Sequence, residues 1–169
     1  MNKERRVFKK GRYVETRKGN YVTKLAKEIV NELKPLSKKI EIVGSIRRHN
    51  PDPVDIDLAV IPKNKKKIES VLKKKGKILE EGEKKSRFRI NGVNIELYYT
   101  KPDSWGATLL AYSSKFGAGI GLRVIARTKG YKLNQYGLFN RKTKRKIAGK
   151  TEKEIYKALE RPYKKPEDR

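Results

Sequence analysis

Residues 40–61 read IEIVGSIRRHNPDPVDIDLAVI, and this stretch decides the fold of the chain. Its first part alternates apolar and polar side chains, which predicts a short strand over 39–43. That strand runs into Gly44-Ser45, where we expect a helix to start. The loop 49–53 that follows is rich in turn-forming residues.

The second half of the stretch, 54–61, is the clearest strand in the sequence. Its apolar side chains point to one side, and Asp55 and Asp57 lie together on the other. A strand over 93–99 likewise places Glu96 on its polar face. If the two strands are neighbours, the three carboxylates converge. The core-facing side chains of the first strand are Val54, Ile56, Leu58 and Val60.

Hydrophobic periodicity and turn signals extend the interpretation along the chain. Asn91-Gly92 is a strong hairpin turn signal, Pro35 ends the first helix, and Thr151 to Glu154 has the spacing of a capping box. Further strands are expected over 77–80 and 86–90, with hairpin character over 131–147. Helices are expected over 21–33, 65–75, 104–113 and 120–128, with a last helix opening at 151.

The organisation changes at two places. Residues 1–19 are basic, polar and poorly periodic, which is typical of a loose arm or of short strands. A break near 101 separates a sheet-rich part, 20–101, from a smaller part, 102–169. We therefore expect an α+β protein: a mixed or antiparallel sheet with helices packed on one face, followed by a small α+β subdomain.

Charge is the strongest compositional signal. Lys and Arg total 45 against 19 Asp and Glu in 169 residues, so the formal net charge is +26. Such a surplus attracts phosphate backbones, and nucleic acid is the expected partner, although a basic architectural protein would share this composition. No segment pairs a basic face with a bulky apolar one, so a membrane is not expected as a partner.

Cysteine and histidine counts narrow the chemistry. The chain has no Cys and one His, which excludes a disulfide scaffold and a thiolate nucleophile and disfavours a zinc site or a His-driven triad. No apolar run reaches the ~18 residues of a membrane span, and the amino terminus has no signal-peptide core. We expect a soluble intracellular protein, of the cytoplasm or of a virus-infected cell or phage host.

Three carboxylates without balancing charge are costly unless a divalent cation binds them. Ligation by Asp55, Asp57 and Glu96 through oxygen alone points to Mg²⁺ or Mn²⁺. Two such ions, roughly 3.5–4 Å apart, would hold the entering and leaving oxygens of a phosphoryl transfer. The alternative is that Asp55 and Asp57 only solvate an exposed strand face.

The turn upstream adds a phosphate-binding element. At Gly44-Ser45 the backbone N–H groups and the hydroxyl can contact a phosphate, and Arg48 can add a fork of donors. Glycine permits a close backbone approach that a side chain would prevent. An ordinary strand-to-helix turn is the alternative, but the pairing of this turn with Asp-x-Asp is more specific than either half.

Gly-Ser-x-Arg-Arg, six residues and Asp-x-Asp together resemble the signature of the nucleotidyltransferase superfamily, in particular the DNA polymerase X (polymerase beta-like) family. The resemblance covers residues 20–169. It implies a catalytic palm over 20–101 and a carboxyl-terminal subdomain over 102–169 that contacts nucleotide and DNA. Other stretches that resemble segments of the family are 93–97 (VNIEL), 105–110 (WGATLL), 129–138 (KGYKLNQYGL) and 151–169.

The resemblance implies a role for each motif residue. Asp55 and Asp57 would ligate both metal ions, and Glu96 would ligate the ion that activates the primer 3′-hydroxyl. The residues expected to bind the nucleotide are Gly44, Ser45, Arg48, Tyr112 and Asn134. The residues expected to bind DNA are Arg123, Arg127, Lys65, Lys66, Lys73 and Lys74.

The sequence departs from the family pattern at three places. Glu96 stands where the family usually has Asp, Ser113-Ser114-Lys115 replaces its turn beside the sugar, and Gly119 replaces a polar minor-groove contact. The family's amino-terminal lyase and DNA-gripping domains are not found either. In this respect the chain resembles the reduced viral members.

The function implied by the resemblance is DNA-directed DNA synthesis. The protein would add a deoxynucleoside monophosphate to a primer 3′ end and release pyrophosphate, filling short gaps in DNA repair. Its partners would be primer-template or gapped DNA and a dNTP, and it would act as a monomer. Two alternatives are a template-independent nucleotidyltransferase acting on DNA, RNA or a small molecule, and a basic DNA-binding module with an inactive site.

Overall fold

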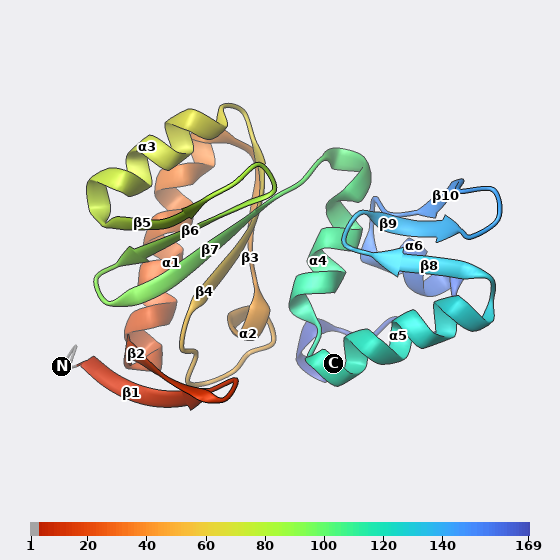
Figure 1. Cartoon of the computed structure of the whole chain (residues 1–169), viewed down its shortest axis with the longest axis horizontal. Coiled ribbons are helices and arrows are strands. Elements are labelled where there is room, and N and C mark those ends of the chain that lie inside the picture. The colour runs from red at the N-terminus through yellow and green to blue at the C-terminus, as the bar shows by residue number, and fades with distance from the viewer. Residues whose placement is uncertain (1–3) are drawn as a thin grey trace. The chain divides into compact units, whose positions relative to one another are not determined.

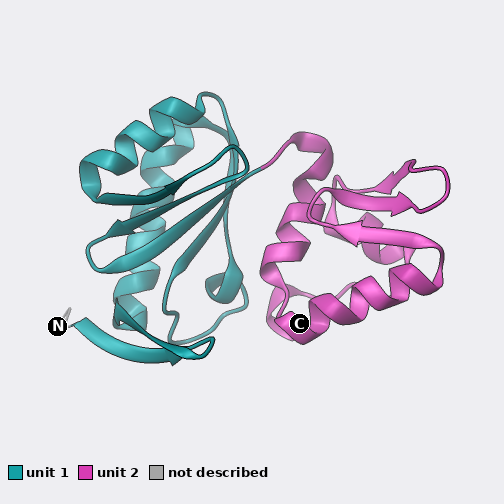
Figure 2. Ribbon diagram, viewed as in Figure 1, with its two compact units in different colours: residues 1–99 teal, residues 100–169 magenta. Residues whose placement is uncertain are grey.

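The computed structural model describes residues 4–169, and the chain divides into two compact units, residues 1–99 and 100–169 (Figure 2). The first unit contains a five-stranded sheet and the second a three-stranded sheet, and each unit has helices and a hydrophobic core of its own (Figure 1). The α+β fold class predicted from the sequence is therefore confirmed.

The large sheet of the first unit is mixed. Its strand order is β3-β4-β7-β6-β5, with β4 and β7 parallel and every other neighbouring pair antiparallel. The Asn91-Gly92 turn joins β6 to β7 with both residues at positive φ, as a two-residue hairpin turn requires. The strands are β3 (Ser37–Val43), β4 (Ile56–Pro62), β5 (Lys77–Glu81), β6 (Lys85–Ile90) and β7 (Val93–Tyr99).

Two helices cover one face of this sheet. The apolar stripes of α1 (Gly19–Leu33) and α3 (Lys65–Lys75) share one buried core with the alternate apolar residues of β4, β6 and β7. Figure 1 shows α1 running behind the sheet. The opposite face keeps the polar side chains of the same strands, because successive side chains of a strand point to opposite sides. Core residues from the sheet include Ile56, Leu58, Val60, Phe88, Ile95 and Leu97.

The predicted arm proves to be a β-hairpin over its described part. Strands β1 (Glu4–Lys9) and β2 (Arg12–Arg17) pair antiparallel through a turn at Lys10-Gly11, where both residues have positive φ. This is the short-strand alternative considered for residues 1–19. Residues 1–3 of that segment lie outside the described part of the chain.

The second unit packs helices against a small antiparallel sheet. Its strand order is β10-β9-β8, and α4, α5, α6, β9 and β10 all contribute to the core. Thr151 caps α6 by accepting a hydrogen bond from the Glu154 N–H at 3.2 Å, as the capping-box spacing predicted. The elements are α4 (Trp105–Ser113), α5 (Phe116–Thr128), β8 (Tyr131–Asn134), β9 (Gly137–Asn140), β10 (Lys146–Ala148) and α6 (Glu152–Ala158).

Several element boundaries differ from the prediction, and two of these differences have a clear cause. Strand β4 begins at Ile56 and not at 54, because the Val54 carbonyl accepts a hydrogen bond from the Thr16 hydroxyl and so does not enter the ladder. Helix α5 begins at Phe116, four residues earlier than expected, since the glycines of its first turns conceal a helical pattern. Within residues 4–169, no helix combines the length and the apolar character needed to cross a membrane.

Candidate active site

The register of two parallel strands brings two predicted carboxylates together. Asp57 on β4 lies directly opposite Glu96 on β7, so both side chains project from the sheet face that the helices leave open. Asp55 lies in the bend immediately before β4, so the prediction that it belongs to the strand was wrong. The structure therefore groups the carboxylates at one end of β4.

Two cations and one phenol contact these carboxylates. The Lys9 ammonium lies 2.7 Å from Asp55 Oδ2, and Arg87 Nε lies 3.1 Å from Glu96 Oε1. The Tyr98 hydroxyl donates to Asp57 Oδ1 at 3.3 Å and also to Glu96. In this arrangement no three carboxylate, imidazole or thiol groups of residues 4–169 are close enough to hold a metal ion as they stand.

Asp57 carries the strongest electrostatic perturbation in the site. Burial, followed by the neighbouring charges of Asp55 and Glu96, raises the pKa of Asp57 from 3.8 to about 7. Lys9 and the hydrogen bond from Tyr98 lower this pKa and only partly offset the rise. An ionised Asp57 is thus short of positive charge, which a divalent cation would supply.

The unsatisfied atoms of the site fit a hard metal ion. Asp55 Oδ1 is buried without a hydrogen-bond partner, although the other oxygen of that carboxylate faces Lys9. Together with Asp57 and Glu96 it gives an all-oxygen donor set, the kind that Mg²⁺ and Mn²⁺ prefer. These three carboxylates could therefore hold such ions.

The Gly44-Ser45 turn lies against the same carboxylates. Gly44 has φ +66°, and a Cβ added there would lie 2.2 Å from Asp57 Oδ2, so the position admits only glycine. Ser45 Oγ is buried without a hydrogen-bond partner in the single turn α2 (Gly44–Arg47). Arg48 caps this turn and is half-buried. The unpartnered Ser45 hydroxyl and the Gly44 backbone thus lie in the turn that adjoins Asp57.

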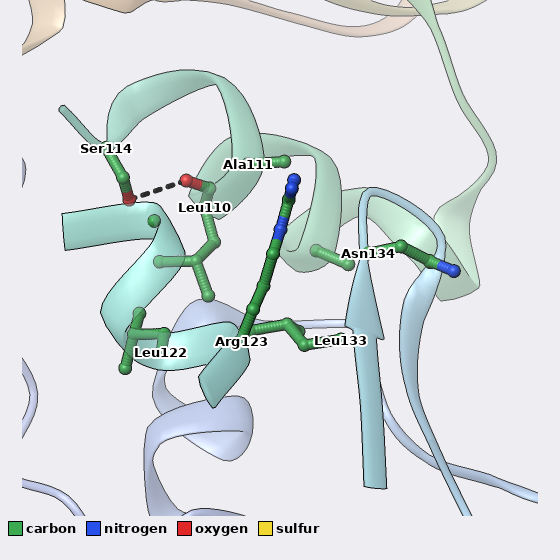
Figure 3. A pocket seen from close by; sticks show the side chains of 9 residues that line it. Leu110, Ala111, Ser114, Leu122, Arg123, Leu133 and Asn134 are labelled. Carbon is green, nitrogen blue, oxygen red and sulfur yellow. Dashed lines mark hydrogen bonds between the residues drawn. The ribbon is translucent and has the colours of Figure 1, made fainter. Parts of the chain in front are cut away.

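The second unit holds the other predicted nucleotide-side residues. Asn134 of β8 and Arg123 of α5 line one small cavity of about 30 Å³ between α4, α5 and β8. Figure 3 shows the Arg123 side chain extending along this cavity toward Ala111. Asn134 Oδ1 accepts the Tyr136 N–H at 2.8 Å, which fixes the turn that follows. Tyr112 is half-buried on α4 and does not line this cavity.

A larger hollow in the second unit is strongly basic. It has a volume of about 390 Å³ and lies along α5, β8 and β9. Two predicted DNA contacts, Arg123 and Arg127, line it, and no acidic residue does. Its other lining residues are Tyr131, Lys132, Leu133, Phe139, Asn140, Arg141 and Lys144. An oxyanion such as a DNA phosphate would therefore meet several cations there.

The lysines predicted to bind DNA from α3 fall into two groups. Lys65 donates to the Gly82 carbonyl at 2.5 Å and lies over the Tyr99 ring, and Lys73 pairs with Glu81 at 3.1 Å. Lys66, Lys73 and Lys74 are all exposed. Contact of these lysines with DNA stays a prediction, and it is better supported for Lys66 and Lys74 than for Lys65 and Lys73, which bind within the protein.

Sequence reasoning missed three residues that contact the carboxylates. Strand alternation places Tyr98 on the same face as Glu96, but no role in the site was predicted for it. The hairpin register, which sets Arg87 opposite Glu96, would have found Arg87. Lys9 lies 46 residues before its partner Asp55, and no local pattern links them.

The first unit, a mixed sheet with helices on one face and with a glycine turn and paired carboxylates on the other, is consistent with a nucleotidyltransferase fold. The DNA polymerase beta thumb family matches residues 120–169. The repair DNA polymerase X of a Warthog/Namibia isolate of African swine fever virus is 32% identical over 147 residues, covering 81% of this chain and 84% of that protein. That of a Tick/Malawi isolate is 31% identical over 168 residues, covering 89% and 93%. The chain belongs to the DNA polymerase X family.

Proposed function

We propose that the protein is a DNA-directed DNA polymerase that fills short gaps in DNA repair. The observation that carries this proposal is the position of Asp57, which lies opposite Glu96 and in contact distance of the Gly44 backbone. This arrangement joins a metal-binding donor set to a phosphate-binding turn. The similarity to viral repair DNA polymerases supports the same reaction and the repair role.

The reaction is an in-line phosphoryl transfer. The primer 3′-oxygen forms a bond to the α-phosphorus of a dNTP, the bond from that phosphorus to the β-phosphate oxygen breaks, and pyrophosphate leaves. The proton of the 3′-hydroxyl is lost as the new bond forms, and Glu96 would accept it. Divalent cations bound by Asp55, Asp57 and Glu96 would neutralise the charge that develops on the phosphates.

The remaining site residues position the substrate. The Gly44 backbone and the Ser45 hydroxyl would donate to the terminal phosphates of the nucleotide, and Arg48 would add charge there. Arg123 and Arg127 in the basic hollow would hold the DNA backbone. We further propose that the protein acts inside cells as a monomer, on primer-template or gapped DNA with a dNTP as substrate.

Primer extension tests this function. A single-nucleotide-gapped duplex with Mg²⁺ is offered each dNTP separately, and the unannealed primer strand is assayed in parallel. The expected product is dominated by the complementary nucleotide and forms only on the duplex. Template-indifferent extension of the lone strand would instead establish a terminal transferase.

A matched variant separates catalysis from binding. Asp57→Asn should abolish extension while duplex affinity stays within about twofold, because the side chain keeps its shape and loses one charge. Mn²⁺ binding, measured by calorimetry, should weaken in the same variant. Wild-type DNA binding with no extension in either Mg²⁺ or Mn²⁺ would favour an inactive DNA-binding module.

A further inference from the structure

The amino-terminal hairpin, β1 and β2, is bound to the loop that precedes β4 and contains Asp55. The Thr16 hydroxyl, on β2, donates to the Val54 carbonyl at 2.5 Å, and Arg5 on β1 pairs with Asp52 at 2.5 Å. Lys9, the last residue of β1, reaches Asp55 at 2.7 Å. The hairpin therefore has a defined position beside the catalytic carboxylates.

The other face of the hairpin carries two exposed aromatic rings. Phe8 and Tyr13 are opposite each other in the β1–β2 register and are 64% and 65% exposed. Their ring centroids are 5.2 Å apart with the planes at 68°, and the Arg6 guanidinium lies 5.1 Å from the Tyr13 ring centre. Two large rings on the surface of a two-stranded hairpin expose apolar area that a partner would remove from water.

The charge around the rings selects the class of partner. Residues 4–17 contain six basic and two acidic side chains. The basic Lys10 and Arg12 flank the two rings in sequence and are exposed at the turn. A partner must therefore offer negative charge together with flat apolar faces. An unpaired DNA strand offers both, since its bases stack on aromatic rings and its phosphates attract the cations.

We propose that Phe8 and Tyr13 form a stacking site for an unpaired base of the DNA strand bound next to the active site. Phe8 directly precedes Lys9, whose side chain contacts Asp55 on the other face of the hairpin, so the stacked base would lie close to the site of synthesis. The inference rests on the proposed function, because it assumes that DNA is held at these carboxylates. To the proposed gap filling, the stacking site adds recognition of the unpaired template base in the gap.

A pair of probes isolates stacking from charge. One is a single-nucleotide-gapped duplex with 2-aminopurine at the unpaired template position, and the other is the same duplex with the gap filled to a nick. Without dNTP, the wild-type protein should quench the 2-aminopurine fluorescence and bind the gapped probe more tightly than the nicked one.

Ring removal should affect only the gapped probe. The double variant Phe8→Val/Tyr13→Val keeps β-branched side chains in the strands, and it should lose about 10-fold in affinity for the gapped probe while its affinity for the nicked probe is unchanged. The salt dependence of binding should keep its slope, since no charge is removed. The exchange Phe8→Tyr/Tyr13→Phe keeps both rings and should behave as wild type.

Three outcomes would overturn the inference. Unchanged quenching and affinity in the valine variant would show that the rings do not stack. An equal loss on both probes would show that the hairpin does not recognise the unpaired base. Wild-type protein that binds neither probe would overturn the proposed function as well, and primer extension reports that case independently.

Discussion

Asp57 should destabilise the metal-free protein above neutral pH. Burial and the charges of Asp55 and Glu96 raise its folded-state pKa from 3.8 to about 7. Between these two values the folded state binds a proton that the unfolded state releases, so stability falls as pH rises through the window from about 4 to about 7. A shift of this size corresponds to at most about 4 kcal/mol, which is lost in full above pH 7.

The variant Asp57→Asn removes this titration and keeps the shape of the side chain. In EDTA at pH 8 it should be more stable than wild type by up to about 4 kcal/mol, and the difference should vanish near pH 4. Adding Mg²⁺ at pH 8 should stabilise wild type more than the variant, because the variant keeps only two of the three carboxylates. Asp57 would thus lower the stability of the folded protein until a divalent cation binds to it.

Urea unfolding at pH 4, 6 and 8 measures the effect. Far-UV circular dichroism follows both units, and the fluorescence of Trp105, the single tryptophan, follows the second unit alone. Glu83→Gln, an equal charge change at an exposed position of the first unit, is the control and should alter stability by less than about 0.5 kcal/mol. A wild-type-minus-variant difference that does not change with pH would refute the argument from burial.

Three further changes test other parts of the structure. Arg169→Ala should destabilise the second unit by about 3–5 kcal/mol in Trp fluorescence-monitored unfolding, because it removes the ion pair that the buried carboxylate of Glu152 makes with the guanidinium at 2.6 Å. Gly44→Ala should weaken Mn²⁺ binding in calorimetry at least 10-fold, since the new Cβ would lie 2.2 Å from a site carboxylate oxygen; unchanged affinity would contradict this. Arg141→Gln/Lys144→Gln should lower the log–log salt slope of duplex binding by about 0.9 for each phosphate that the variant no longer neutralises, and an unchanged slope would remove these residues from the DNA interface.

Features with a local cause could be predicted from the sequence. Asn91-Gly92 adopts positive φ at both residues, and the hairpin it closes was expected from this dipeptide alone. Alternation also assigned Asp57 and Glu96 to polar strand faces. The prediction that these two carboxylates lie together required the two strands to be neighbours. The structure shows that they are, because β4 pairs with β7 in parallel. The fold class and the family followed from these motifs together.

Features that depend on distant partners were missed or misplaced. Strand β4 starts late because a threonine on the amino-terminal hairpin takes the Val54 carbonyl, and α5 starts early although Gly117 and Gly119 weaken its first turns. Lys9 reaches Asp55 only because the hairpin folds back onto this loop. The two cations that balance the charge of the site, Lys9 and Arg87, come from strands β1 and β6, so no short sequence window contains both together with the carboxylates.

The net charge of the chain bears on how the proposed metal ions would bind. A body with a formal charge of +26 repels free divalent cations at long range, and Lys9 and Arg87 already occupy two of the three carboxylates. A nucleoside triphosphate or DNA supplies negative charge, which weakens the repulsion between the protein and a divalent cation. Its phosphates also compete with the carboxylates for the side chains of Lys9 and Arg87. Metal binding and substrate binding would therefore be coupled favourably, and by linkage each would strengthen the other by the same factor. In such a protein Asp55, Asp57 and Glu96 would bind a divalent cation more weakly without substrate than with it, which would favour phosphoryl transfer in the substrate-bound state.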